Sequence, residues 1–148
     1  MSLIWKIKPF KTLSLDELYN VLELRSEVFV VEQNCVYQDI DGKDRKAIHI
    51  IGEYEGETVA YCRIFKAGDY FEQSSIGRVI VKETYRDKKW GHDLIREAIE
   101  AVKSNFGESK ITISAQLYLK KFYESHGFAQ TSEEYLEDGI PHIEMKRG

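Results

Sequence analysis

Two β-rich segments separated by only two residues constrain the fold of this 148-residue chain more than any other feature. The segments cover residues 47–54 and 57–65, and Glu55 and Gly56 lie between them. The glycine can adopt the positive φ angle that a two-residue hairpin requires. We therefore expect the two segments to pair as antiparallel strands of a sheet.

Helical patterns precede and follow this hairpin. Ser14 is expected to cap the first helix, with Glu17 as its capping-box partner. Two rows of apolar residues along this helix predict burial on more than one side. The rows contain Leu15, Leu18, Leu22 and Phe29, and Val21, Leu24, Val28 and Val31.

Strands and helices alternate along the rest of the chain. Residues 32–44 are polar and acidic without periodicity, which predicts a long loop, and long loops are often functional. The further expected elements are a strand at 75–82, a helix from about residue 91 that stops at Gly107, a strand at 110–115, a helix at 117–126 and two strands around a turn at 137–139. The order β-α-β-β-β-α-β-α-β-β predicts a single α/β domain over residues 1–148, with helices on the faces of a mixed sheet.

Composition excludes several classes of protein. With 43% hydrophobic residues, 31% charged residues and two prolines, the chain is neither disordered nor fibrous. It has no apolar run of membrane-spanning length and no signal-peptide pattern, so we expect a soluble, cytoplasmic protein without a membrane partner. The net charge of −4 argues against nucleic-acid binding. Cys35 and Cys62 form no CxxC pair, which favours buried, reduced thiols over a disulfide or a zinc site.

The segment from residue 79 to residue 92 is the most informative for function. A buried strand leads through a short charged loop into a helix, and such a junction presents unpaired N–H groups and the positive end of a helix dipole. Phosphate is the natural ligand of such a site. The alternative is a solvated basic turn before an ordinary helix. The local charge of +2 comes from four basic residues, Lys82, Arg86, Lys88 and Lys89, against two acidic residues, Glu83 and Asp87.

This segment resembles the acetyl-CoA signature of the GNAT family of N-acetyltransferases, a strand followed by Arg/Gln-x-x-Gly-x-Gly/Ala at the start of a helix. Arg86 and Gly91 match the first and last motif positions, and Lys89 stands where the first glycine would be. That glycine lets the backbone approach a diphosphate closely, whereas a lysine offers an ammonium group instead.

A second segment, residues 116–128, resembles the closing helix of the same family. Tyr123 fits the pattern Phe/Leu-Tyr-Glu-x-x-Gly-Phe, and Gln116 occupies the place of an asparagine seven positions earlier. Residues 30–35, 37–42 and 137–142 resemble the ElaA branch of the family, which implies no well-defined substrate.

The resemblance implies an enzyme that transfers an acetyl group from acetyl-CoA directly to a primary amine in a ternary complex, without a metal. It places the pantetheine arm along residues 79–81, a backbone N–H near Val79 on the acetyl carbonyl, and Tyr123 as general acid. The alternative is that Tyr123 packs with Phe122 in the core. The residues assigned to the cofactor are Val79, Ile80, Val81, Arg86, Asp87, Lys88, Lys89, Trp90, Gly91, His92, Gln116 and Tyr123.

No motif identifies the base that would deprotonate the amine. Glu32, Asp39 and Asp41 in the acidic loop, and His142 near the C-terminus, are candidates by their chemistry and by the family's usual placement of acceptor groups. Each could instead be a surface or loop-capping residue. An acidic lining would attract a cationic amine.

The sequence disfavours a metal site, but it leaves open a rival function and the oligomeric state. The four histidines show no HxxxH pairing, which disfavours a metal site. A non-catalytic acyl-CoA-binding or partner-binding domain with the same fold is the rival interpretation, because Lys89 replaces a motif glycine and no base is identified. The sequence does not decide whether the chain forms a homodimer.

Overall fold

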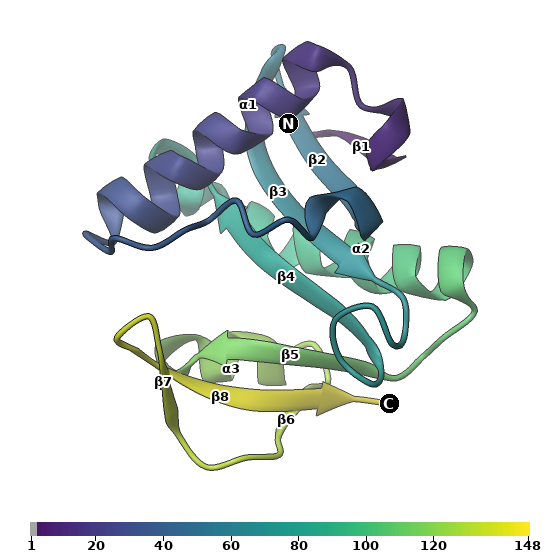
Figure 1. Cartoon of the computed structure of the whole chain (residues 1–148), viewed down its shortest axis with the longest axis vertical. Coiled ribbons are helices and arrows are strands. Elements are labelled where there is room, and N and C mark those ends of the chain that lie inside the picture. Colours follow the sequence, from purple (N-terminus) through teal and green to yellow (C-terminus); the bar gives the residue numbers. More distant parts are fainter. Residues whose placement is uncertain (1–2) are drawn as a thin grey trace.

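The computed structural model describes residues 3–148, which form a mixed sheet with helices on both faces (Figure 1). The strand order is β1-β2-β3-β4-β5-β8-β6, and β7 also pairs with β8. The predicted mixed α/β sheet is confirmed. The strands are β1 (Ile4–Pro9), β2 (Ile48–Tyr54), β3 (Glu57–Phe65), β4 (Ser74–Val81), β5 (Ile111–Gln116), β6 (Ala129–Gln130), β7 (Tyr135–Glu137) and β8 (Ile140–Arg147).

The predicted hairpin is present between β2 and β3, which pair antiparallel. Glu55 and Gly56 form its turn with φ angles of 50° and 81°. Positive φ angles at both turn positions match the right-handed twist of the flanking strands.

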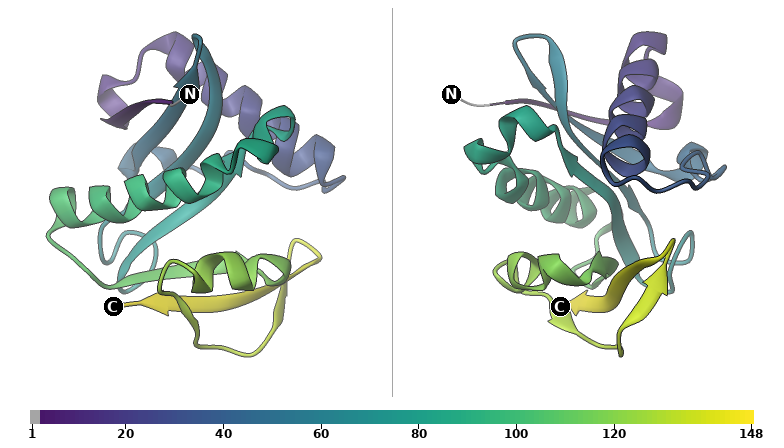
Figure 2. Two further views of the ribbon diagram at one scale, coloured as in Figure 1. Left: turned by 180° about the vertical axis from the view of Figure 1, so that it is seen from behind. Right: turned by 90° about the vertical axis from the view of Figure 1, so that its left-hand side faces the viewer.

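The helices cover opposite faces of the sheet (Figure 2). Helix α1 (Leu15–Arg25) packs on one face, where its Val21 and Leu24, together with Val28 of the turn that follows it, meet the side chains of Ile51, Tyr61 and Ile80. Helix α2 (Trp90–Phe106) and the short helix α3 (Lys120–Glu124) pack on the other face in a larger apolar cluster. Between them the helices cover both sides of the central strands.

The start of α1 agrees with the prediction, but its buried face does not. The Glu17 amide donates to Ser14 Oγ at 3.0 Å and the Ser14 amide donates to Glu17 Oε1 at 2.8 Å, which confirms the capping box. Leu15 and Val31 were predicted to be buried, yet they are 87% and 72% exposed. The helix touches the sheet along a single stripe, and after Arg25 it widens into a π-helical turn, Ser26–Glu32, which turns Val31 outward.

The C-terminal half also follows the predicted order, with shorter elements. Gly107 ends α2 with a φ angle of 67°, as predicted. The helix expected at 117–126 consists of a 3₁₀ turn, Leu117–Leu119, followed by α3. Strands β7 and β8 flank the predicted turn, and the two-residue strand β6 was not predicted. No helix within residues 3–148 has the length and apolar character of a membrane span.

Candidate active site

A cleft opens where β4 and β5 separate. These parallel strands pair only at Ser74 with Ile111 and at Ser75 with Thr112, and then they diverge (Figure 1). The resulting cleft has a volume of about 530 Å³. Because β8 pairs with the far edge of β5 and β3 with the far edge of β4, the facing edges of β4 and β5 both remain open beyond these two pairs.

The open edge of β4 offers backbone hydrogen-bonding groups to the cleft. The Lys82 amide donates to Val59 O of β3 at 2.7 Å, so strand alternation turns the backbone groups of Val81 and Val79 away from β3. Arg86 Nε donates to Val81 O at 3.0 Å. An irregular register opposite β3 and a φ angle of 53° at Arg78 form a bulge next to Val79.

The loop between β4 and α2 is a 3₁₀ segment, Glu83–Lys88, that ends in a left-handed residue. Lys89 adopts left-handed angles, φ 60° and ψ 26°, at the position where glycine was expected, so the lysine keeps the backbone path that a glycine would take. Helix α2 begins directly afterwards, and no side chain of the described residues caps its N-terminus. The first amides of α2 are therefore available to an anion.

Most of the residues predicted to bind a cofactor line the cleft. They are Val79, Ile80, Val81, Arg86, Lys89, Gly91, His92, Gln116 and Tyr123. Asp87 and Lys88 are exposed and do not line it. The Trp90 side chain also lies outside the cleft: its ring lies 5.3 Å from the Tyr54 ring and 5.5 Å from the Tyr85 ring in the core, so only the backbone of Trp90 is left for a cofactor contact. The helix period turns Gly91 and His92 to the cleft and Trp90 away from it.

Residues 32–35, which we call the strap, bridge the cleft at three points. Glu32 makes a two-pronged ion pair with Arg86 at 2.5 and 2.8 Å. Gln33 Nε2 donates to Gln116 Oε1 of β5 at 3.4 Å. Cys35 Sγ donates to the carbonyl of Asp138 at 3.3 Å, in the turn between β7 and β8. Nothing in the sequence pattern predicted these contacts.

Tyr123 is buried and lines the same cleft. Its side chain is 5% exposed, and its ring packs edge-on against Phe122 and Phe128. Burial raises the pKa of its hydroxyl well above the usual value, so the group stays protonated at neutral pH. Tyr123 is therefore a core residue with a protonated hydroxyl group that also contributes to the lining of the cleft.

The family model of the acetyltransferase (GNAT) domain matches residues 12–147 of this chain. The chain belongs to the GNAT family. ElaA of Escherichia coli (strain K12) is 46% identical over 97% of this chain and 95% of ElaA. The crystal structure of Escherichia coli ElaA matches at a TM-score of 0.92, with 44% identity over 99% of each chain. An acyl-CoA N-acyltransferase from Pseudomonas aeruginosa matches at a TM-score of 0.94, with 40% identity over 99% of this chain and 100% of that chain.

Membership of the GNAT family makes the chain an acyltransferase of the N-acetyltransferase type. The resemblance inferred from the two motifs is thus confirmed, as is the fold that it implied. No group of three or more His, Cys, Asp or Glu side chains within residues 3–148 is arranged to hold a metal ion.

The four base candidates divide into two pairs in this GNAT chain. Glu32 and His142 line the cleft. His142 Nδ1 lies 2.7 Å from Ile140 O, and its Nε2 lies 3.5 Å from Glu137 Oε2. Asp39 and Asp41 do not line the cleft, because arginines hold both carboxylates in the loop that follows the strap. The expectation that either aspartate serves as the base is therefore not supported.

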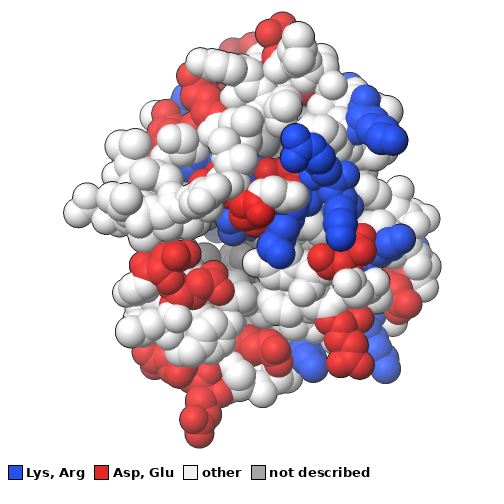
Figure 3. Space-filling view, in the orientation of Figure 1, with Lys and Arg blue, Asp and Glu red and all other residues white. Residues whose placement is uncertain are grey.

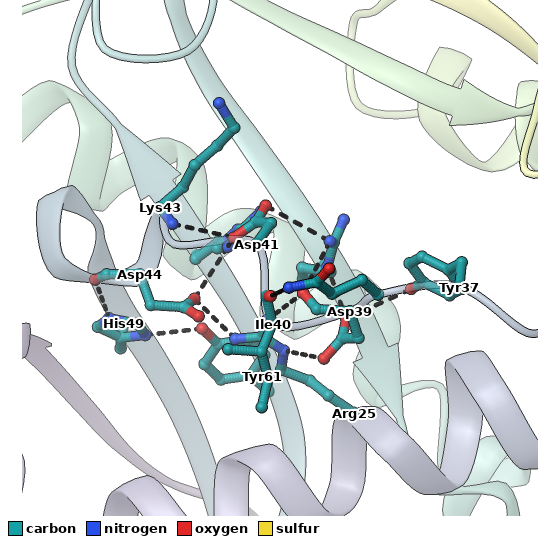
Figure 4. A network of polar contacts seen from close by, with 12 residues as sticks. Arg25, Tyr37, Asp39, Ile40, Asp41, Lys43, Asp44, His49 and Tyr61 are labelled. Carbon is teal, nitrogen blue, oxygen red and sulfur yellow. Dashed lines mark hydrogen bonds and ion pairs between the residues drawn. The ribbon is translucent and has the colours of Figure 1, made fainter.

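A buried network of arginines and aspartates accounts for these two carboxylates (Figure 4). Arg25 is fully buried and donates to Asp39 at 2.9 Å and to Asp44 at 2.7 Å. Although burial alone would raise the pKa of Asp41, hydrogen bonds from the Arg63 guanidinium hold that pKa well below its usual range. Asp41 is therefore too weak a base for an ammonium group.

Sequence reasoning missed this network, although a signal was present. Arg63 and Arg78 interrupt two apolar strand patterns, and Arg25 lies between apolar residues of the first helix. A charged residue inside an apolar run must find a buried partner or leave the core. The acidic loop supplies those partners. Cys62 is buried as predicted, whereas Cys35 is only half-buried.

Proposed function

We propose that this enzyme transfers an acetyl group from acetyl-CoA directly to a primary amine within a ternary complex. One observation carries the proposal: the open edge of β4, the uncapped start of α2 and the Tyr123 side chain all meet in one cleft. A GNAT family acetyltransferase from Elizabethkingia anophelis, whose crystal structure has acetyl-CoA bound, shares the fold at a TM-score of 0.67 and 16% identity.

The residues present fit the parts of acetyl-CoA. The first amides of α2 and the Lys89 ammonium suit the diphosphate. Gly91 lines the cleft next to Phe122, and a Cβ atom added to it would make an ordinary van der Waals contact with the Phe122 ring at 3.6 Å. The backbone groups of Val79 and Val81 suit the amides of pantetheine, which would bind like an added strand. When bound, acetyl-CoA supplies the acetyl group as a thioester.

The side chains of the cleft then provide the proton transfers. The Val79 amide would donate to the negative charge that develops on the acetyl oxygen, and Tyr123 would protonate the departing thiolate. Deprotonating an amine of pKa ~10.4 at pH 7 costs ~4.6 kcal/mol, so a base is needed. Of the two predicted candidates that line the cleft, Glu32 is held by Arg86 in an ion pair, so His142 is the candidate that no arginine of the described chain holds.

Titration calorimetry with acetyl-CoA and with desulfo-CoA tests the binding step. We expect both to bind, since the diphosphate and pantetheine contacts do not involve the thioester. Thiol release from acetyl-CoA in the presence of an amine panel tests transfer. Absence of heat at millimolar ligand would refute the proposal, and heat without thiol release would favour a domain that only binds acyl-CoA.

Substitution of Lys89 separates its charge from its backbone conformation. Lys89→Ala and Lys89→Gly should each weaken acetyl-CoA binding about 5-fold, because ~1 kcal/mol of exposed charge pairing is lost. Only the glycine variant relieves the left-handed strain, so it should exceed the alanine variant in unfolding free energy by about 1 kcal/mol. Calorimetry and urea titration measure the two effects. Lys88→Ala is the matched control, and unchanged affinity of both Lys89 variants would exclude a phosphate contact.

A further inference from the structure

The cleft has a second part that the proposed cofactor contacts do not use. Tyr70 and Phe71 lie in the connection that precedes β4, at the opposite end of that strand from the loop that leads to α2. The Tyr70 ring lies 5.1 Å from the Phe65 ring and 4.9 Å from the Phe71 ring. Together with Tyr37 these rings give one end of the cleft an aromatic wall.

Arg78 adds a hydrogen-bond donor to this part of the cleft. Its Nε donates to Asp39 Oδ1 at 2.8 Å and its Nη2 donates to Asp39 O at 3.1 Å. Its Nη1 has no partner among residues 3–148, and the side chain is 17% exposed in the cleft wall. The guanidinium lies 5.7 Å from the centre of the Tyr37 ring. Arg78 directly precedes Val79, whose amide is proposed to hold the acetyl carbonyl, and both residues line the cleft.

Arg63 is a second arginine of the cleft lining with an unused donor. Its side chain is 1% exposed, and its two terminal nitrogens donate to Asp41 and Asp44. Its Nε is buried without a partner in the described structure. A buried N–H group without an acceptor is costly, and an oxygen of a bound molecule is one way to satisfy it after a small movement of the wall.

The charges of the cleft do not suit a polyamine. Asp39, Asp41 and Asp44 are all held by arginines, so the acidic loop offers no unpaired carboxylate, in contrast to the sequence-based expectation. Glu137 and Asp138 line the cleft from the turn between β7 and β8. On the face drawn in Figure 3, acidic side chains gather at the lower left of the hollow and basic ones gather on its other side. The cleft is therefore polarised between an acidic and a basic wall.

We propose, on the basis of the acetyl transfer proposed above, that the acceptor is an α-amino-carbonyl compound with an aromatic side chain. Its ammonium group faces the acidic turn with Glu137. Its carboxylate or carbonyl oxygen binds the free Arg78 donor, and its ring packs on the wall with Tyr70 and Phe71. A free aromatic amino acid and the amino terminus of a peptide share this chemistry. The ammonium group first loses one proton to a base. The transfer then forms an N–C bond at the acetyl carbon, breaks the C–S bond and releases a second nitrogen proton, which balances the proton that Tyr123 gives to the thiolate.

Thiol release with matched amines tests the acceptor class. We expect kcat/KM for L-phenylalanine or L-phenylalaninamide to exceed that for 2-phenylethylamine and for L-alanine by about tenfold, and that for spermidine by more. The amide and the free acid distinguish a peptide terminus from an amino acid. Equal or better use of spermidine or 2-phenylethylamine would overturn the inference while leaving acetyl transfer intact.

If no amine releases thiol, the proposed acetyl transfer is contradicted. The acceptor site can then still be tested by binding measurements. L-Phenylalaninamide should then still bind the complex of the enzyme with desulfo-CoA more tightly than 2-phenylethylamine does, as measured by calorimetry. Equal affinities of the two amines, or no binding of either, would refute the proposed acceptor site.

Two variants test which cleft residues recognise the carbonyl group and the aromatic ring of the acceptor. Arg78→Lys should lower the ratio of kcat/KM for L-phenylalaninamide to kcat/KM for 2-phenylethylamine about tenfold, because lysine keeps a positive charge beside Asp39 but lacks the free Nη1 donor that would bind the carbonyl oxygen. Tyr70→Leu, at an exposed position that tolerates change, should reduce the preference for L-phenylalaninamide over L-alaninamide several-fold. Tyr19→Leu, exposed on α1 and outside the cleft, is the control. Unchanged preferences in both cleft variants would refute the assignment.

Discussion

Replacing Tyr123 by phenylalanine is expected to lower kcat for acetyl transfer about 100-fold or more, while Kd for acetyl-CoA changes less than about twofold. The substitution keeps the buried ring and its contacts with Phe122 and Phe128, and it removes only the proton that the departing thiolate needs. Stopped-flow or steady-state thiol release gives kcat, and calorimetry gives Kd.

Two controls separate this role from packing. No hydrogen bond joins the Tyr123 hydroxyl to another residue within 3–148, so the thermal midpoint of Tyr123→Phe should stay close to that of the wild type. Tyr118→Phe removes a more exposed hydroxyl from the wall of the same cleft and should leave kcat nearly unchanged. A normal kcat in Tyr123→Phe, or an equal loss of kcat in Tyr118→Phe, would contradict the assignment of Tyr123 as general acid.

Replacing Arg25 by methionine should lower the free energy of unfolding by about 3–5 kcal/mol, because the buried network then holds three carboxylates against two guanidinium groups and so carries one uncompensated negative charge. Arg25 is fully buried and donates to two carboxylates and to the Asp39 carbonyl. The loop that carries Asp39 and Asp44 should loosen as a result. Urea titration at neutral pH measures the loss.

Arg96→Met is the matched control for this loss. Arg96 makes an ion pair with Asp93 on the exposed side of α2, and such a surface pair contributes at most about 1 kcal/mol. Adding Asp44→Asn to Arg25→Met should recover part of the stability, because one unpaired charge is then removed. If Arg25→Met were as stable as Arg96→Met, the network would not hold the loop.

The features that the sequence predicted well depend on neighbouring residues. The capping box at Ser14 and the hairpin at Glu55 and Gly56 are set by short-range hydrogen bonds and backbone angles, so their patterns sufficed. The junction between β4 and α2 was predicted for the same reason. Lys89 shows the limit, since its left-handed angles follow from the family's loop geometry and not from lysine's own preference.

The features that the sequence failed to predict depend on distant partners. Asp39 and Asp41 were predicted as base candidates in a long acidic loop. In the structure they pair with Arg25 of α1, Arg63 of β3 and Arg78 of β4. Their distances along the chain prevented any local pattern from showing the pairing. The contacts of the strap, such as Glu32 with Arg86, are separated by 54 positions and were missed for the same reason.

The two-pair ladder between β4 and β5 has a consequence for the stability of the protein. Only two residue pairs join β4 to β5, so side-chain packing and the strap must hold the strands β1–β4 against the strands β5–β8. A thioester arm bound as proposed would stabilise the folded state, because it would bind between β4 and β5, where strand pairing is missing, and would bind only the folded chain. A bound acyl donor would in that case raise the free energy of unfolding by the free energy of its binding to the folded state.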